Sequence, residues 1–435
     1  MARIPEALAA LSLRVESLDG EGRGVARNAD GKVVFVEGAL PGEDVDFTVL
    51  KKKLSHEFGK ATAILSASSA RVAPRCPHFG VCGGCATQHA DSRTQMAAKQ
   101  RWLEENLARI GRVRPESLLP IVYGPDWGYR NRARLSVRRV PSKGGVLVGF
   151  REKRSTFVAD MKECPVLPPR VSALIPALRN VIESLSINER VPQVEVAAAD
   201  DAIAMVFRHL LPFNEKDFSL LRTFARQNSI QVWLQPGGPE SAHPLEAADH
   251  LLHYDLPEFG VRIGFRPTEF TQVNFAVNRV LVSRAMRLLD LQPGERVADL
   301  FCGLGNFSLA LAAKGSQVVG FEGSAPLVKR AQENAKANGL VAQFEVVDLF
   351  KNDIRAFGPF DKLLIDPPRE GAVDLMKSLP EGWPRRIVYV SCDPATLARD
   401  AGILVHTKGF RLVQAGVANM FPHTAHVESV ALFER

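Results

Sequence analysis

The chain has 435 residues, of which 46% are hydrophobic, enough to bury more than one core, and three or four domains are expected. It contains neither an 18-residue apolar run nor a signal-peptide core, which argues against a membrane-spanning or secreted protein and predicts a soluble, cytoplasmic one. In a reducing compartment the six cysteines are expected to be ligands, nucleophiles or packing groups rather than disulfides.

The net charge of +7 is concentrated in one stretch. Residues 91–170 carry 17 basic and 8 acidic side chains. A solvated basic face is the simpler explanation. However, arginines such as Arg132 and Arg134 alternate along a predicted strand beside aromatic residues, which favours a surface that binds phosphates. Nucleic acid is therefore the expected partner.

Five short strands with alternating apolar residues are predicted between residues 13 and 65, separated by glycine-rich turns. Five strands in this length indicate a small closed barrel of the OB type, which often binds oligonucleotides. A purely structural barrel is the alternative. We expect this domain to span residues 11–66.

Four cysteines follow in the pattern of a metal site. Cys76, Cys82 and Cys85 are spaced C-x5-C-x2-C, and Cys164 lies far downstream. The set suits either tetrahedral zinc or a [4Fe–4S] cluster. Prolines after the outer cysteines and glycines between the close ones favour the cluster, because backbone N–H groups then approach sulfide. Four thiolates would saturate the cluster, so it would be structural or contact RNA. The predicted iron–sulfur segment is 67–110.

The middle of the chain predicts a mixed α+β domain over residues 111–265 that also contributes Cys164. A helix over residues 92–110 precedes it. The elements expected within it are hairpins at 129–160 and 193–209, a helix at 215–226 and a strand at 230–235.

From residue 274 onward strands and helices alternate, which is typical of a doubly wound parallel sheet. We therefore expect a Rossmann-like α/β domain with a seven-stranded sheet over residues 266–435. The expected helices are 274–289, 307–313 and 325–338, and the expected strands are 296–301, 317–321, 343–347, 362–365, 387–390, 410–416 and 426–433.

Acidic residues follow successive strands of this sheet. A glycine-rich turn, DLFCGLGN, comes after the first strand, Glu322 ends the second and Asp348 the third, and Asp366 opens a DPPR loop after the fourth. An acid after strand two hydrogen-bonds ribose hydroxyls. Without a full G-x-G-x-x-G or a Walker lysine, S-adenosylmethionine is the expected ligand rather than a dinucleotide or ATP.

A β-branched run ends at Cys392, one strand after the DPPR loop. A packing cysteine is the alternative, but a thiol beside a carboxylate at this edge indicates covalent catalysis on a base. Uracil C5 is too weak a nucleophile to attack a sulfonium methyl group. A thiolate added to C6 activates C5, and a base must then remove the C5 proton. Glu428, in FPHTAHVE, is the candidate base.

Five motifs together resemble the RNA uracil-5-methyltransferase family: FTQVN, DLFCGLGNFSL, DPPREG, SCDPATLARD and FPHTAHVE. GEGRGVAR and VEGALPGE resemble its TRAM domain. The match covers nearly the whole chain. It is closest to the branch that methylates 23S rRNA with both barrel and cluster cysteines, since the tRNA branch lacks the cysteines and the other 23S rRNA branch lacks the barrel.

The resemblance implies a class I enzyme, expected to be a monomer, that methylates a specific uridine of 23S rRNA. It implies Cys392 as nucleophile, Glu428 as base and Phe270 near the target base. Another 23S rRNA uridine or the tRNA T-loop is the alternative substrate. Asn419 departs from an aspartate of the family, which puts one local hydrogen bond in doubt. The residues implied to contact S-adenosylmethionine are Gln272, Phe301, Asn306, Glu322, Asp348 and Asp366.

Two other classes of protein would share part of these features. A base N-methyltransferase would also carry D-P-P after the fourth strand, but it would have an aromatic residue next, where this chain has Arg369; Arg369 and Cys392 both argue against that class. A non-catalytic iron–sulfur RNA-binding protein would explain the barrel and the cysteines, but it would leave Cys392 and Glu428 without a role.

Overall fold

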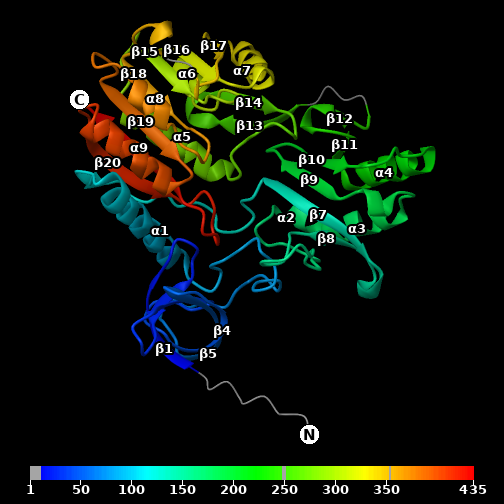
Figure 1. Ribbon diagram of the computed structural model, residues 1–435. Coiled ribbons are helices and arrows are strands. Elements are labelled where there is room, and N and C mark those ends of the chain that lie inside the picture. The colour runs from blue at the N-terminus through cyan, green and yellow to red at the C-terminus, as the bar shows by residue number, and fades with distance from the viewer. Residues whose placement is uncertain (1–10, 247–250, 352–353) are drawn as a thin grey trace.

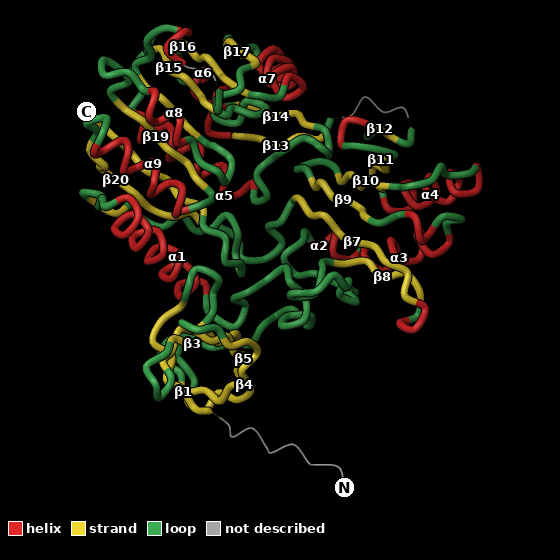
Figure 2. The backbone as a smooth tube through the Cα atoms, in the orientation of Figure 1, coloured by secondary structure: helices red, strands yellow, loops and turns green. Residues whose placement is uncertain are grey.

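The computed structural model describes residues 11–246, 251–351 and 354–435. Figure 1 shows three bodies: a β-barrel, a central α+β domain and an α/β domain built on the largest sheet. The tube in Figure 2 shows that irregular loops, rather than helices or strands, connect them where they meet. No helix in the described part of the chain is long and apolar enough to cross a membrane.

The N-terminal barrel is closed in the order β1-β2-β3-β5-β4. β3 and β5 run parallel, whereas the other neighbours are antiparallel. Alternate side chains such as Val34, Val36 and Val45 are fully buried inside it. The expected OB-type barrel is confirmed. Its strands are β1 Leu11–Leu18, β2 Gly24–Arg27, β3 Val33–Glu37, β4 Asp44–Lys52 and β5 His56–Ser66.

The central domain is a six-stranded sheet in the order β12-β11-β10-β9-β7-β8. Its helices α3 and α4 pack against the sheet through Leu178, Ile182 and Leu221. The strands are β7 Arg132–Val140, β8 Gly145–Gly149, β9 Gln193–Ala198, β10 Ile203–Arg208, β11 Gln231–Gln235 and β12 His243–Pro244. The helices are α2 Pro169–Ala173, α3 Ile175–Ser184 and α4 Glu215–Asn228.

The α/β domain holds an eight-stranded sheet in the order β17-β16-β15-β18-β19-β21-β20-β6, with β21 antiparallel to both neighbours. This confirms the Rossmann-like fold. The strands are β15 Arg296–Leu300, β16 Gln317–Glu322, β17 Gln343–Val346, β18 Lys362–Ile365, β19 Arg386–Ser391, β20 Arg411–Ala418 and β21 Glu428–Glu434. The helices are α5 Phe275–Leu289, α6 Ser308–Ala313, α7 Ala325–Ala337, α8 Val373–Ser378 and α9 Pro394–His406.

Two pieces from earlier in the chain complete this domain. Helix α1 (Ser92–Asn106), expected as part of the iron–sulfur segment, packs on α9 and β20, and its Met96 and Leu103 are fully buried there. β6 (Ser117–Leu118) adds a parallel eighth strand beside β20, where seven strands were expected. Such a short strand has no alternation by which the sequence could reveal it.

One hairpin was also not predicted from the sequence. β13 (Leu252–Leu256) and β14 (Val261–Phe265) pair antiparallel, and their Tyr254 and Phe265 join the core beneath α5, α6 and α7. Helices α1, α8 and α9 share a core on the opposite face of the sheet. The sheet is therefore covered on both faces, which leaves its carboxyl edge as the place for chemistry.

Candidate functional site

Strand register brings Cys392 and Glu428 together. β19 ends at Ser391 and β21 begins at Glu428. The strands are antiparallel and Ser391 pairs with Ser429, so the residue after Ser391 and the residue before Ser429 lie opposite each other. The Ser429 hydroxyl donates to the Ser391 carbonyl at 3.0 Å, which holds the two strand ends together.

The Cys392 thiol is half-buried at the start of α9, whose first N–H groups are capped by Asp393. A helix N-terminus favours a thiolate. Burial outweighs that effect: together with the nearby Glu428 and Asp366 carboxyls it raises the pKa of Cys392 to about 11, while Arg369 opposes the shift. The thiol therefore carries its proton in the free protein.

Three carboxyl groups lie at the same edge of the sheet. Burial and the neighbouring Asp366 raise the pKa of Glu428, which is 2% exposed, well above its usual range. Burial and Asp299 raise the pKa of Asp366 to about 7, and burial raises that of Asp299 to about 7 as well. One oxygen of Asp299 accepts from the Ser308 hydroxyl, and the other is buried without a partner. Burial therefore favours the protonated form of these three acids, and a positive charge bound nearby would favour their carboxylate form.

The glycine-rich turn after β15 is shaped for a close ligand. Gly303 and Gly305 have φ of +55° and +92°, and Phe301 has +65°, a conformation that costs energy for a residue with a Cβ. The Gly303 N–H donates to Glu322 at 3.2 Å, so the acid that ends β16 contacts the turn directly. Phe301 and the exposed Phe350 have ring centroids 5.5 Å apart, at one side of this turn.

Asn306 is held by residues that sequence reasoning missed. Its side-chain oxygen accepts from the Tyr254 hydroxyl at 2.9 Å and from the Asn278 amide at 2.8 Å, and its amide donates back to Asn278. The β13–β14 hairpin thus supports the turn from below. Asp348, which follows β17, is partly exposed and accepts from Lys351 at 2.9 Å.

The loop with Phe270 and Gln272 is fixed by the central domain. The Arg132 guanidinium donates to the Pro267 carbonyl at 2.7 Å, and the Asn131 N–H donates to Val273 at 2.7 Å. Phe270 itself is 67% exposed, and Gln272 is half-buried. The loop can therefore present an aromatic ring toward a substrate.

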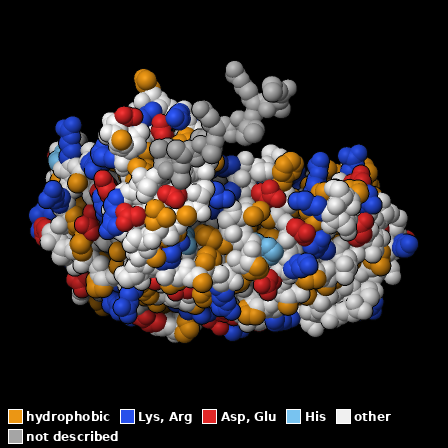
Figure 3. Space-filling view, turned by 90° about the horizontal axis from the view of Figure 1, so that it is seen from below, with side chains coloured by type: hydrophobic (Ala, Val, Ile, Leu, Met, Phe, Trp, Pro, Cys, Tyr) orange, Lys and Arg blue, Asp and Glu red, His pale blue; other side chains and the backbone are white. Residues whose placement is uncertain are grey.

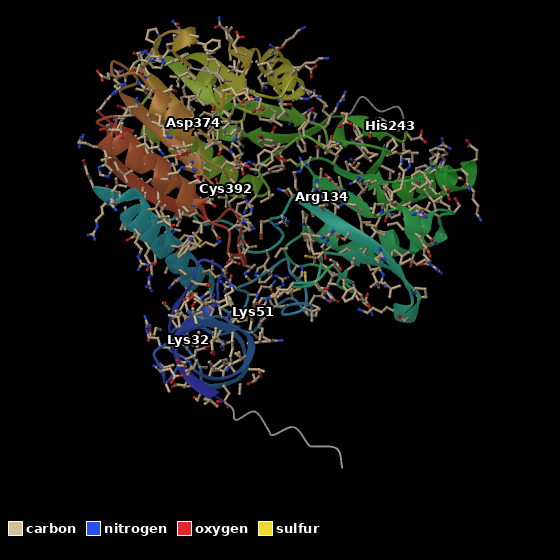
Figure 4. The ribbon with its side chains drawn as sticks, in the orientation of Figure 1. Lys32, Lys51, Arg134, His243, Asp374 and Cys392 are labelled. Carbon is tan, nitrogen blue, oxygen red and sulfur yellow. The ribbon has the colours of Figure 1, made fainter. Side chains whose placement is uncertain are left out.

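Arg132 and Arg134 differ in their surroundings, contrary to the expected row of solvent-facing arginines. Burial lowers the pKa of Arg132. Arg134 is exposed but paired with Glu195 at 2.7 Å. Figure 4 places Arg134 on β7 and Cys392 at the end of β19, on opposite sides of the junction between their domains. On the face shown in Figure 3, Lys and Arg side chains are interspersed with Asp and Glu rather than gathered in one patch.

Cys76, Cys82, Cys85 and Cys164 line one cavity of about 210 Å³. Thr424 and His426, from the loop before Glu428, line it too. Burial raises the pKa of all four thiols. Within the described residues, no three His, Cys, Asp or Glu side chains are close enough to hold a single metal ion.

A cleft of about 800 Å³ opens above Cys392. Its walls come from the barrel, including Arg23, Arg27 and Phe35, and from α1 with Trp102. The barrel and the catalytic edge therefore face the same space.

Comparison with known proteins agrees with this architecture. The family model for tRNA (Uracil-5-)-methyltransferase matches residues 92–435, and the TRAM domain model matches residues 11–62. A 23S rRNA (uracil(1939)-C(5))-methyltransferase RlmD of Thiobacillus denitrificans is 62% identical over 96% of this chain and 98% of its own. An RlmD of Nitrosospira multiformis is 59% identical, and the match covers 97% of this chain and 98% of the RlmD.

The fold has a counterpart among solved structures. The tRNA (uracil-54, C5)-methyltransferase of Pyrococcus abyssi, crystallised with S-adenosyl-L-homocysteine, superposes with a TM-score of 0.76. It is 24% identical, and the match covers 97% of this chain and 99% of that one. Family model, relatives and fold agree with the motifs around Cys392, and the chain belongs to the uracil-5-methyltransferase family, with a TRAM domain at its N-terminal end.

Proposed function

We propose that the protein methylates C5 of a uridine in 23S rRNA, with S-adenosylmethionine as methyl donor. The target would be uracil 1939, the position for which its RlmD relatives are named. The observation that carries the proposal is the opposed pair of Cys392, which lines the cleft beside the barrel, and Glu428, which is buried behind it.

The residues divide the chemistry between them. Cys392 adds as thiolate to C6 of the uracil, and the electron pair of the C5–C6 bond makes C5 nucleophilic. C5 takes the methyl group, and the ring then carries both a methyl and a proton at C5. Glu428 removes that proton, the C5–C6 double bond re-forms, and the Cys392 thiolate leaves.

The Cys392 thiol must lose its proton before this sequence can start, because burial raises its pKa to about 11. S-adenosylmethionine supplies a positively charged sulfonium and an electrophilic methyl group. A positive charge near Asp366 lowers the pKa of that acid, and the favourable field extends to Cys392 and Glu428.

The donor set fits this cofactor. Glu322 suits ribose hydroxyls, and the open turn at Gly303 and Gly305 admits a ligand close to the backbone. Phe301 and Phe350 offer rings for an adenine. Asp366 and the unpartnered oxygen of Asp299 provide acceptors at the reacting end.

The target base must leave its stack to reach Cys392. The cleft gives it a route between the barrel and α1, and the exposed Phe270 offers a face on which a base can stack. Arg23, Arg27 and Arg109 along the cleft can contact phosphates. We expect a monomer acting in the cytoplasm, where ribosomal RNA is found.

A [4Fe–4S] cluster on Cys76, Cys82, Cys85 and Cys164 belongs to the same proposal. All four thiols line one cavity of about 210 Å³, which supports a group larger than a single ion. The Gly84 N–H already points at the Cys82 sulfur, at 3.3 Å. A Cβ on Gly83 would lie 3.0 Å from the Arg151 carbonyl, a contact tighter than is usual, so the backbone approaches closely at this glycine.

Methyl transfer from labelled cofactor to 23S rRNA of a strain lacking this protein tests the function. We expect one 5-methyluridine, mapped at position 1939. Methylation at another uridine or in tRNA only would replace the target, and no transfer to any RNA would overturn the function.

Anaerobic purification tests the cluster. We expect about four irons per chain and a broad absorption band near ~400 nm. Stoichiometric zinc without iron would contradict the cluster.

A further inference from the structure

The loop that leads into the candidate base needs outside support. Residues 419–427, the base loop, connect β20 to β21 and end directly before Glu428. His423 within it has φ of +65°, in the left-handed region that disfavours residues with a Cβ. A loop with such a residue keeps one conformation only when its surroundings hold it there.

Two buried side chains of α1 bond to this loop. Lys99 donates to the Phe421 carbonyl at 2.8 Å and to the Asn419 side chain at 3.4 Å. Gln95 accepts from the His423 N–H at 2.8 Å, and its amide lies 3.2 Å from the His423 ring nitrogen. Gln95 is 3% and Lys99 6% exposed, so both are withheld from water.

The burial of Lys99 indicates that its hydrogen bonds matter. Burial lowers the pKa of Lys99 to about 7, with Asp126 opposing the shift. Asn419 bridges the two, because its oxygen accepts from Lys99 and its amide lies 3.4 Å from Asp126. An apolar side chain would be less costly to bury. What a lysine adds at this place is a donor to the base loop.

The cysteine segment, defined here as residues 76–91 before α1, holds the loop from the other side, together with Tyr129. The N–H of Ala86, the residue after Cys85, donates to the His423 carbonyl at 2.8 Å. The Tyr129 hydroxyl donates to the Pro422 carbonyl at 2.9 Å. The base loop is thus fixed between α1 and the segment that carries the cysteines.

We propose that Gln95 and Lys99 are positioning residues: they fix the base loop and so place the Glu428 carboxyl for removal of the C5 proton. The Ala86 contact makes the same placement depend on an ordered cysteine segment, so loss of the cluster loosens the loop. This inference rests on the proposed role of Glu428 as base.

Lys99→Met tests the inference, because it keeps the length of the side chain and removes the donor. Arg93→Met is the matched control, since Arg93 is an exposed cation on the same helix and contacts neither the base loop nor the cleft. We expect Lys99→Met to lower kcat about a hundredfold, with KM for RNA and cofactor unchanged. A covalent, methylated protein–RNA adduct should accumulate, because thiol addition precedes the step that Glu428 performs.

Hydrogen exchange of the base loop is the second measurement. Residues 419–427 should exchange faster in Lys99→Met, in Gln95→Met and in the wild type after cluster removal, and not in Arg93→Met. Normal turnover of Lys99→Met would overturn the inference, as would lost activity with unchanged exchange and no adduct. If Lys99→Met does not fold, Gln95→Met decides by the same readouts.

Failure of the proposed function can be distinguished from failure of the positioning role of Gln95 and Lys99. If the wild type methylates no RNA, the proposed function is wrong, and hydrogen exchange still decides whether α1 holds the loop. If the wild type methylates RNA and the variants behave like Arg93→Met, only the positioning role is wrong.

Discussion

The catalytic edge of the large sheet and the cysteine segment are constructed in opposite ways. Cys392 and Glu428 stand on paired strands, and backbone register alone places them opposite each other. Cys76, Cys82 and Cys85 lie in irregular backbone before α1, and Cys164 comes from a distant loop. The first arrangement is fixed by the polypeptide, whereas the second, if it holds the proposed cluster, would depend on that ligand to hold its parts together. Variants in the two regions should therefore fail differently.

Cys392→Ala should show the largest effect, and on activity only. If Cys392 is the nucleophile, as proposed, its loss should lower methyl transfer at least on the order of 10⁴-fold. The thiol forms no hydrogen bond in the described structure and is half-buried, so thermal unfolding should stay close to that of the wild type. Cofactor binding measured by calorimetry should persist. Residual turnover near the wild-type rate would show that the thiol is not the nucleophile.

Cys164→Ala should show the reverse pattern. Cys164 is 5% exposed, and its loss removes one side of the cluster cavity. We expect iron to be lost and the unfolding temperature to fall by about 5 °C or more. Cys302→Ala is the matched control, because Cys302 is a buried thiol outside that cavity and its loss should leave the iron content unchanged. Full iron content in Cys164→Ala would remove this residue from the ligand set.

The pH profile of kcat/KM sharpens the contrast at the catalytic edge. The raised pKa of Cys392, about 11, leaves little thiolate at neutral pH in the free enzyme. The thiolate fraction grows about tenfold per pH unit below that pKa, and kcat/KM reports the free enzyme. We expect kcat/KM to rise by about that factor per unit from about pH 7 to 9. A profile that is flat over this range would place the thiolate, and the cause of its activation, differently.

Sequence patterns predicted the elements that carry periodicity and the residues that carry motifs. The barrel, the strand–helix alternation and the edge with Cys392 all follow from local patterns. β6 did not, because two residues show no alternation. The β13–β14 hairpin was also not predicted, although the sequence of β13, LHYDL, alternates between buried and half-buried positions. The burial of Arg132 was also missed, since alternation along a strand does not tell which face meets a neighbouring loop.

Asn419 stands where the family has an aspartate. The sequence put one hydrogen bond of the usual aspartate in doubt. In the structure the Asn419 amide links Lys99 to Asp126, so a carboxylate from another segment stands near the lysine instead. No local pattern announces such a contact, because its partners are almost three hundred residues apart in sequence.

Arg132 and Arg134 allow the smallest effects to be compared. Arg134→Ala should lower RNA affinity slightly and reduce the slope of log affinity against log salt by about one or less, because its charge is shared with Glu195. Arg132→Met should leave that slope unchanged and lower kcat, because it frees the loop with Phe270. Binding titrations across salt concentrations check both. Equal loss of slope in both variants would mean that both arginines contact phosphates.

The division of labour between Cys392 and Glu428 is tested most directly with Glu428→Gln. The substitution keeps the size of the side chain and removes the proposed base. The step of that base comes after thiol addition and methyl transfer, so those two steps can still occur. We expect Glu428→Gln to accumulate a covalent, already methylated protein–RNA adduct that survives denaturing electrophoresis and is absent from Cys392→Ala. Normal turnover of Glu428→Gln, or loss of activity without any adduct, would contradict it.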